Sequence, residues 1–154
     1  MIRAMTPADI LPSAALVARS WMRAYADIVP VELQPTAAEH ADHLAQPDSR
    51  GWVYDLGNRV AAVALVTGTD TPEPELSVLH VDPPAQGAGV GRHLHDAVLD
   101  ALRAAGHAGC HLWVFAANEH ARAFYAARGW HETTASDAPA RCSAAPAVRL
   151  AFAF

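Results

Sequence analysis

The feature of this chain that most restricts its fold is a run of glycines between a strand-like and a helix-like segment. In the stretch "PPAQGAGVGR" at 83–92, glycine occupies positions 87, 89 and 91. The apolar run "ELSVLHV" at 75–81 precedes the glycines, and apolar residues recur with helical spacing over 90–105. Glycine at this density is typical of backbone that turns tightly or comes close to a ligand. The pattern therefore predicts a strand–loop–helix unit whose loop either turns tightly or binds a ligand through its backbone.

Two nucleotide-binding loops can be excluded on composition and spacing. A Walker A loop needs a lysine at the phosphates, and all eleven basic residues of this chain are arginine. A dinucleotide fingerprint needs G-x-G-x-x-G, whereas the glycines here follow G-x-G-x-G and a hairpin comes before their strand. Two interpretations stay open: a backbone site for pyrophosphate at a helix N-terminus, or a tight turn.

The rest of the chain predicts an α+β fold in one domain, residues 1–154. Strands are expected at 2–3, 51–56, 59–68, 75–81, 110–115, 130–134 and 147–154, with a hairpin turn at Gly57-Asn58. Helices are expected from about residue 9 to 29, within 36–46, over 90–105 and from Asn118 to about 128. Antiparallel strands come first and strand–helix–strand units follow, so the helices are expected on the faces of one sheet.

Two motifs, in this order, resemble the GNAT superfamily of N-acetyltransferases. The segment 79–94 follows L-x-V-x-P-x-x-[RQ]-G-x-G-x-[GA]-x-x-L, matching at Leu79, Val81, Pro83, Gln86, Gly87, Gly89, Gly91 and Leu94. The segment 118–130 follows N-x-x-A-x-x-F-Y-x-x-x-G-[FW], matching at Asn118, Ala121, Phe124, Tyr125, Gly129 and Trp130. The resemblance covers nearly the whole chain and is weak over 136–147.

The resemblance implies a mixed, mostly antiparallel sheet of six to seven strands, with helices on both faces and a splay between the fourth and fifth strands. It also implies acetyl-CoA as co-substrate. His40 and His43 lie three residues apart on the helix expected within 36–46, but no third ligand is evident, so no metal is expected. The loop backbone would wrap the pyrophosphate, and the preceding strand would hold the pantetheine arm with main-chain groups. The implied cofactor-binding residues are Leu79, His80, Val81, Gln86, Gly87, Ala88, Gly89, Val90, Gly91, Arg92, Asn118 and Tyr125.

Tyr125 and Glu75 are the candidate catalytic residues. Direct transfer from a thioester expels a thiolate, and in the family the tyrosine of the F-Y pair protonates that sulfur as general acid. Glu75 matches the position where many members carry a base that deprotonates the amine. Simpler roles stay open, since Tyr125 could only pack a helix face and Glu75 could be a strand-edge charge. His80 is a rival base.

The function expected from these residues is direct transfer of an acetyl group to a primary amine of a small molecule or a protein. The alternative is an acyl-CoA-binding sensor or scaffold without turnover, which would have no need of Tyr125. Segments 19–48 and 133–147 are expected to shape the acceptor site. Trp21 and Tyr25 are expected mainly to pack the first helix on the sheet.

Charge and cysteine content restrict the partners and the compartment. The formal net charge is −5 with no basic run, which argues against nucleic acid as a partner. No apolar stretch is long enough to span a bilayer, so no membrane partner is expected. Two cysteines, Cys110 and Cys142, cannot make a disulfide framework, which favours the cytoplasm. A homodimer is left open.

Overall fold

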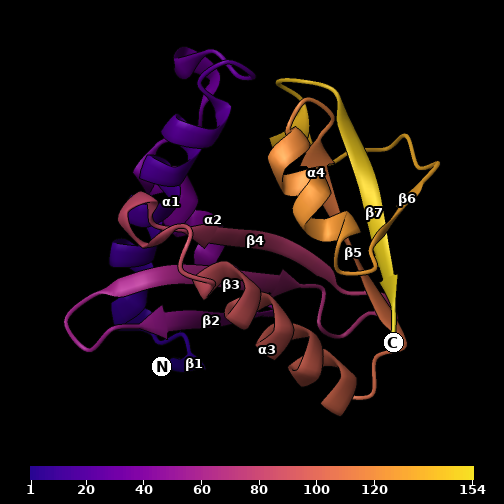
Figure 1. Cartoon of the computed structure of the whole chain (residues 1–154), viewed down its shortest axis with the longest axis horizontal. Helices are drawn as coiled ribbons and strands as arrows, with labels where there is room; N and C mark the ends of the chain where they lie inside the picture. The colour runs from indigo at the N-terminus through magenta and orange to yellow at the C-terminus, as the bar shows by residue number, and fades with distance from the viewer.

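The computed structural model describes residues 1–154 and contains one seven-stranded sheet flanked by helices (Figure 1). The strands are β1 (Ile2–Ala4), β2 (Ser49–Asp55), β3 (Val60–Thr67), β4 (Glu75–Val81), β5 (Gly109–Phe115), β6 (His131–Thr133) and β7 (Ala147–Ala153). The longer helices are α1 (Ile10–Tyr25), α2 (Ala37–Leu44), α3 (Val90–Ala104) and α4 (Glu119–Ala126). The strand order β1-β2-β3-β4-β5-β7-β6 confirms the predicted α+β class with a mostly antiparallel sheet.

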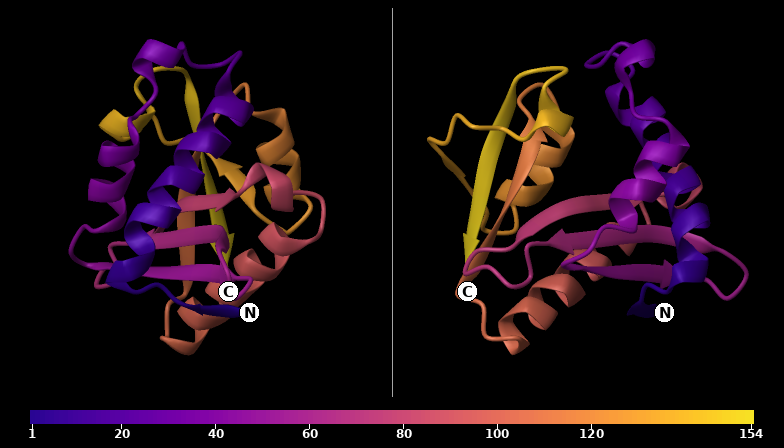
Figure 2. Two further views of the ribbon diagram at one scale, coloured as in Figure 1. Left: turned by 90° about the vertical axis from the view of Figure 1, so that its left-hand side faces the viewer. Right: turned by 180° about the vertical axis from the view of Figure 1, so that it is seen from behind.

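Helices cover both faces of the sheet and divide the core in two. On one face, α1 and α2 pack over β3 and β4 around Leu16, Val53 and Val63. On the other face, α3 packs over β2, β3 and β4, and α4 contributes to the same core through Tyr125. Figure 2 shows α1 and α3 on opposite sides of the first strands. Strand β3 is buried on both sides, which explains why "AAVALV" reads as a continuous apolar run rather than as an alternation.

Helix α3, which follows the glycines, buries the apolar face that its sequence predicts. Val90, Leu94, Val98 and Leu102 repeat at every fourth position and are all buried. Full burial of a leucine or valine side chain stabilises the fold by about 1.5–3 kcal/mol. Gly106 follows the helix with φ +90°, as predicted for a residue that ends a helix in the left-handed conformation.

The sheet opens between its fourth and fifth strands, as the resemblance implied. Strands β4 and β5 are parallel and pair at one position, Glu75 with His111. The neighbouring pairs are continuous, for example from Gly109–Ala153 to Phe115–Ala147 between β5 and β7. Beyond Glu75 the edge of β4 that faces β5 therefore has no strand partner. Figure 2 shows the two halves of the sheet diverging from this point.

The second half of the sheet is a three-stranded antiparallel unit. Strand β7 lies between β5 and β6, so the chain end is held in the sheet interior. A short 3₁₀ turn, η4 (Ala140–Cys142), lies in the connection from β6 to β7. None of the helices combines the length and apolar composition that a bilayer crossing requires.

Candidate active site

A β-bulge in β4 turns several polar side chains toward α1 and α2. Leu65 pairs with Val78 but the next residue, Val66, pairs with Leu76, so Ser77 is an extra residue in β4. Both Ser77 and Val78 face α1 and α2: the Ser77 hydroxyl lies 3.3 Å from His43 Nε2, and Val78 belongs to the core under α1 and α2. Bulges commonly redirect side chains next to active sites. The local sequence gives no signal that predicts the bulge at Ser77.

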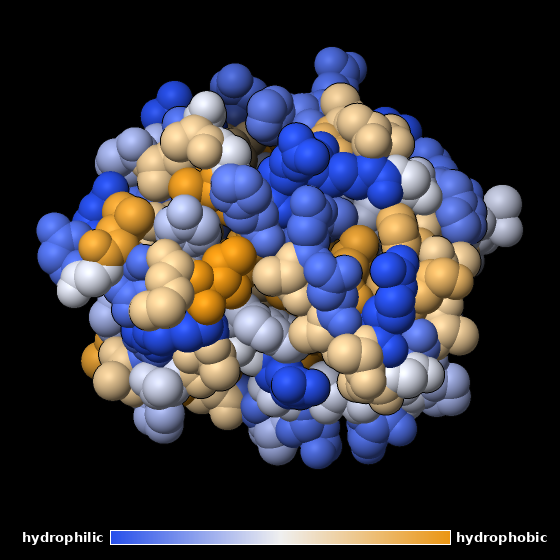
Figure 3. Space-filling view, turned by 60° about the horizontal axis from the view of Figure 1, so that its bottom comes forward, coloured by the Kyte–Doolittle hydropathy of each residue, from blue (hydrophilic) through white to orange (hydrophobic).

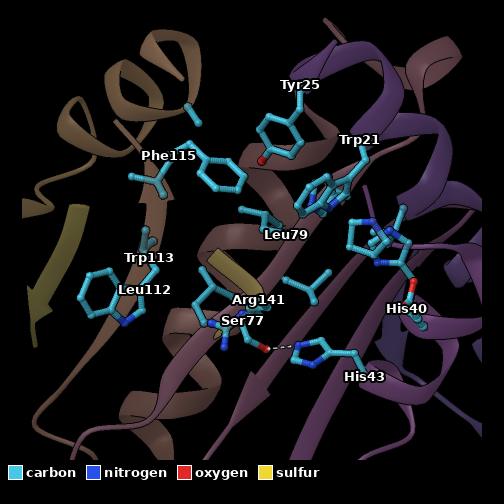
Figure 4. Close-up of a pocket in the computed structure, with 18 of the residues that line it drawn as sticks. Trp21, Tyr25, His40, His43, Ser77, Leu79, Leu112, Trp113, Phe115 and Arg141 are labelled. Carbon is cyan, nitrogen blue, oxygen red and sulfur yellow. Dashed lines mark hydrogen bonds between the residues drawn. The ribbon is translucent and has the colours of Figure 1, made fainter. Parts of the chain in front are cut away.

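A cavity of about 380 Å³ passes through the opening between β4 and β5. Residues from both faces of the sheet line it, because Tyr125 and Ala121 of α4 reach it from one side and α1 and α2 from the other. We call its second side the acceptor wall, defined by Trp21, Tyr25, His40, His43 and Arg141 (Figure 4). Helices α1 and α2 and the turn η4 supply these residues, so the segments 19–48 and 133–147 meet at one cavity as expected.

The glycine loop, residues 86–92, presents a row of free backbone donors at the start of α3. Gly87 and Gly89 have φ +83° and +79°, a conformation that favours glycine. The amide N–H groups of residues 87–92 donate no hydrogen bond within the protein, since the first helix donors are His93 and those after it. Adjacent free N–H groups at a helix N-terminus suit a phosphate anion. The loop could therefore hold a pyrophosphate, and the tight-turn interpretation stays open.

Close packing explains the third glycine. A Cβ added to Gly91 would lie 3.1 Å from Val81 Cγ2, so a side chain there would push α3 away from the end of β4. The Gln86 side-chain amide donates to the Val81 carbonyl at 3.1 Å and holds the loop against the same strand end.

Asp82 anchors the strand end before the loop, a role that sequence reasoning missed. Its carboxylate is buried and accepts from Arg19 Nε and Arg59 Nη1, both at 3.0 Å. One acid thereby ties α1 and the β2–β3 turn to the strand end that carries the glycine loop. The sequence suggests only turn chemistry beside Pro83.

Tyr125 is packed so that its ring is fixed while its hydroxyl is free. The ring lies 5.2 Å from Phe124 and 5.5 Å from Trp130, centroid to centroid. The hydroxyl makes no hydrogen bond within the protein and is not among the buried unpaired polar atoms, so it remains accessible in the cavity. Burial raises the pKa of Tyr125 well above its usual range. The phenol therefore stays protonated at neutral pH and can donate.

A second phenol faces the same cavity. Tyr25 on α1 packs against Trp21 at 4.5 Å and reaches across the opening to Phe115 of β5 at 5.2 Å. Burial raises the pKa of Tyr25 to about 12. Trp21 and Tyr25 line the cavity and also pack α1 on the sheet, since Trp21 contacts the core under α1 and both rings contact Phe115 of β5.

Glu75, the predicted base, is held by an arginine. Both of its carboxylate oxygens accept from Arg141 Nη2, and His111 Nε2 lies 3.9 Å away. The single arginine nitrogen leaves room for a further donor on the carboxylate. Arg141 was missed in the sequence because it lies where the resemblance is weakest.

His80, the rival base, is oriented by a serine on α1. Its Nδ1 lies 2.8 Å from Ser20 Oγ, and its ring packs edge-on to Tyr25 at 6.4 Å. Desolvation lowers the pKa of His80 to about 4, so the imidazole is neutral at neutral pH. Leu79 and Val81, its neighbours on β4, pack instead toward the α3 core.

Asn118 and three arginines, Arg92, Arg122 and Arg128, have distinct partners. The Asn118 Oδ1 accepts from the Ala121 amide at 3.1 Å, which confirms its expected role as N-cap. Arg122 binds Glu132 and Arg128 stacks on Phe124. Arg92, in the first turn of α3, has only a long contact of 3.8 Å to Asp96 and is 68% exposed. Of the three arginines it is the one left available to a ligand phosphate.

The comparison with known sequences matches most of the chain. A model of the acetyltransferase (GNAT) family matches residues 16–130. The mycothiol acetyltransferase of Beutenbergia cavernae is 48% identical over 61 residues, which are 40% of this chain and 20% of that protein. The match therefore spans about a fifth of the length of this relative.

Solved structures share the fold over nearly the whole chain. The PaiA N-acetyltransferase of Thermoplasma acidophilum, in complex with coenzyme A, has a TM-score of 0.80 at 15% identity, covering 100% of this chain and 98% of that one. The ribosomal-protein-S18-alanine N-acetyltransferase of Escherichia coli has a TM-score of 0.77 at 22% identity, covering 99% and 92%. At such identities the likeness establishes the architecture.

Proposed function

The chain belongs to the acetyltransferase (GNAT) family, and from that premise we propose that it transfers an acetyl group from acetyl-CoA directly to a primary amine of a small molecule or a protein. The observation that carries the proposal is the cavity through the splayed sheet, which is lined from both faces. A thioester threaded between β4 and β5 and an amine entering along the acceptor wall would meet without an acyl-enzyme intermediate. The acceptor named for the B. cavernae relative is not carried over, because the match is short.

The donor would bind mainly through backbone. The free N–H groups of residues 87–92 would hold its pyrophosphate, and the unpaired edge of β4 at Leu79–Val81 would bind the pantetheine amides as a strand does. Gln86 would keep the loop in place and Asn118 would contact the arm from the start of α4. The PaiA relative, solved with coenzyme A, supports this donor.

The chemistry would pair Tyr125 with Glu75. The amine nitrogen attacks the thioester carbonyl carbon, the C–S bond of the tetrahedral intermediate breaks, and Tyr125 gives its phenolic proton to the sulfur. Glu75 accepts the proton that the amine loses, directly or through water, and that proton later restores the Tyr125 phenol. The products are the acetamide and free CoA, so atoms and charges balance. Arg141 Nη2 binds both oxygens of the Glu75 carboxylate and would hold it in place.

The cysteines support a reducing compartment for this reaction, and we take the cytoplasm as the location. Both Cys110 and Cys142 are free thiols in the fold. Burial raises the pKa of each thiol, which argues against a nucleophilic cysteine in the transfer.

Thermal unfolding with and without acetyl-CoA, followed by thiol release with a panel of primary amines, tests the proposal. Saturating acetyl-CoA should raise the melting temperature, because a ligand at about 100 times its Kd stabilises the native state by about 2.7 kcal/mol. Thiol release should then depend on an amine. Stabilisation without amine-dependent thiol release would support the non-catalytic sensor, and no stabilisation by any acyl-CoA would exclude both.

A further inference from the structure

The acceptor side of the cavity carries three imidazoles, His40, His43 and His80. Figure 4 shows the first two. The three differ in whether they have hydrogen-bond partners. Two of them are held by hydrogen bonds inside the protein. The Nδ1 of His43 lies 3.1 Å from Gln46 Nε2 and its Nε2 lies 3.3 Å from Ser77 Oγ, so both ring nitrogens are occupied. His80 is bound to α1 through its Nδ1.

His40 alone among the three has no hydrogen bond from its side chain. It is only 8% exposed. Its Nε2 has no partner and no accessible surface, whereas its Nδ1, also without a partner, keeps accessible surface and is the nitrogen that a ligand in the cavity can reach. The ring sits on α2 with its centroid 5.7 Å from that of Trp21, one turn before His43. Buried polar side chains in native proteins are nearly always paired, with protein groups or with water, so an unpaired imidazole on a cavity is a candidate to bind a polar ligand group in place of water.

The surroundings of His40 favour a neutral ligand group. Desolvation lowers the pKa of His40, with its neighbour His43 acting in the same direction and Glu39 opposing it. Trp21 of α1 and His80 of β4 are the other groups with charge or π-character that face it. A neutral imidazole offers one N–H donor and one acceptor nitrogen, and which nitrogen carries the proton depends on the tautomer. A hydroxyl both donates and accepts, so it suits either tautomer.

We infer that His40 is a specificity-determining residue, which binds a hydroxyl group of the acceptor away from the reacting amine. The inference rests on the proposed function and deepens it, because it makes the acceptor an amino alcohol. His40 lies on α2, whereas Tyr125 reaches the cavity from α4 on the other face of the sheet. The amine must be near Tyr125 for transfer, so the group that His40 meets is a second one on the same molecule.

The test compares pairs of primary amines of equal length, with and without a hydroxyl, in wild type, His40→Leu and His43→Gln. Wild type should favour the hydroxylated amine about 10–100-fold in kcat/KM, the range expected for one buried hydrogen bond to substrate. His40→Leu should bring the two amines within about threefold while the KM for acetyl-CoA stays unchanged. His43→Gln, the matched change of a satisfied imidazole, should keep the preference.

Thermal stability without any ligand gives an independent measurement. Removing an unpaired buried nitrogen leaves nothing else unsatisfied, so His40→Leu and the ring-sized His40→Phe should melt at or above the wild-type temperature. A structural histidine would behave in the opposite way, with both variants melting lower and both amines slowed equally.

The outcomes separate this inference from the proposed function. A preference for the hydroxylated amine that survives in both His40 variants, or no preference in wild type, would overturn the role of His40 while acetyl transfer stands. No transfer to any amine by wild type would overturn the proposed function, and the inference with it.

Discussion

The glycine loop and the acceptor wall are built in different ways. The loop is a single run, residues 86–92, and what it offers is backbone: six consecutive N–H groups without partners. The acceptor wall is assembled from α1, α2 and η4, and what it offers is side chains, most of which are aromatic or titratable. A site for a constant cofactor can be made from backbone, whereas a site for a particular acceptor needs chosen side chains.

Four substitutions test this contrast, and they are given in order of decreasing expected effect. The largest effect is expected at Tyr125 of α4, which lines the cavity together with the acceptor wall. Tyr125→Phe should lower kcat about 10³-fold and leave the Kd for acetyl-CoA within about twofold, because it removes the proton donor without changing the packing of the ring. Steady-state kinetics and calorimetric titration of acetyl-CoA give the two numbers.

Tyr25→Phe is the matched variant, since it removes the other phenol of the cavity. It should cost less than about tenfold in kcat, because Tyr25 approaches from the acceptor wall. An equal or larger loss in Tyr25→Phe would move the acid role to α1 and contradict the assignment of Tyr125.

The difference between the two regions also explains what the sequence could predict. The loop and α4 are each one continuous stretch of sequence. Short motifs could therefore identify Gly87, Gly89, Asn118 and Tyr125. These motifs correctly placed the strand–loop–helix unit and the opening beside β4, and the N-cap at Asn118 follows from its side-chain chemistry. The roles of the cofactor-binding residues themselves remain predictions.

The acceptor wall could not be predicted to the same depth because long-range contacts create it. The bulge at Ser77 arises from its register against Leu65, and a one-residue shift changes which side chains face the cavity. Arg141 meets Glu75 across 66 positions of sequence, through a segment without a regular pattern. The sequence favoured packing of α1 on the sheet for Trp21 over one aromatic side of the acceptor site, because the sequence alone cannot distinguish a core residue from a cavity wall.

The second prediction concerns Glu75, the proposed base. Glu75→Gln should lower kcat/KM about 10²-fold at neutral pH, because a base of this kind contributes roughly 10²–10⁴-fold. The deficit should shrink as the pH rises toward the pKa of the amine, since each pH unit then supplies about ten times more free amine without help from a base. The measurement is the ratio of wild-type to variant kcat/KM from about pH 6 to 9.

Glu73→Gln is its control, because Glu73 pairs with Arg149, whereas Glu75 pairs with Arg141 of the acceptor wall. Neither carboxylate is itself among the cavity-lining residues. Glu73→Gln should leave kcat/KM unchanged. A ratio for Glu75→Gln that stays constant with pH would mean that the residue only holds Arg141, and the base would then be sought at His80.

The third prediction tests whether the glycine loop binds acetyl-CoA through its backbone N–H groups. Gly89→Ala puts a side chain at φ +79°, with only His93 Cε1 within 4 Å at 3.8 Å, so the strain is conformational. A left-handed conformation costs about 1–2 kcal/mol for a residue with a Cβ, and the relaxing loop should lose alignment of its N–H groups. The KM for acetyl-CoA should rise about tenfold.

Gly57→Ala carries the same strain in the β2–β3 turn, at φ +88° with nothing near the added Cβ. It should lower the free energy of unfolding by a similar amount and leave the KM for acetyl-CoA unchanged. If Gly89→Ala behaves in the same way as Gly57→Ala, the loop is a turn and not a phosphate site.

The smallest effect is expected for Arg92, the one charged side chain of the glycine loop. Arg92 is exposed and weakly paired, so a phosphate contact there would be solvent-screened and worth well under 1 kcal/mol. Arg92→Gln should therefore raise the KM for acetyl-CoA about twofold to threefold, with a smaller difference at high salt. Arg122→Gln, whose guanidinium is already bound to Glu132, should raise it less. An increase of tenfold or more for Arg92→Gln would mean that a side chain and not the backbone dominates donor binding, and the contrast between the two regions would fail at that point.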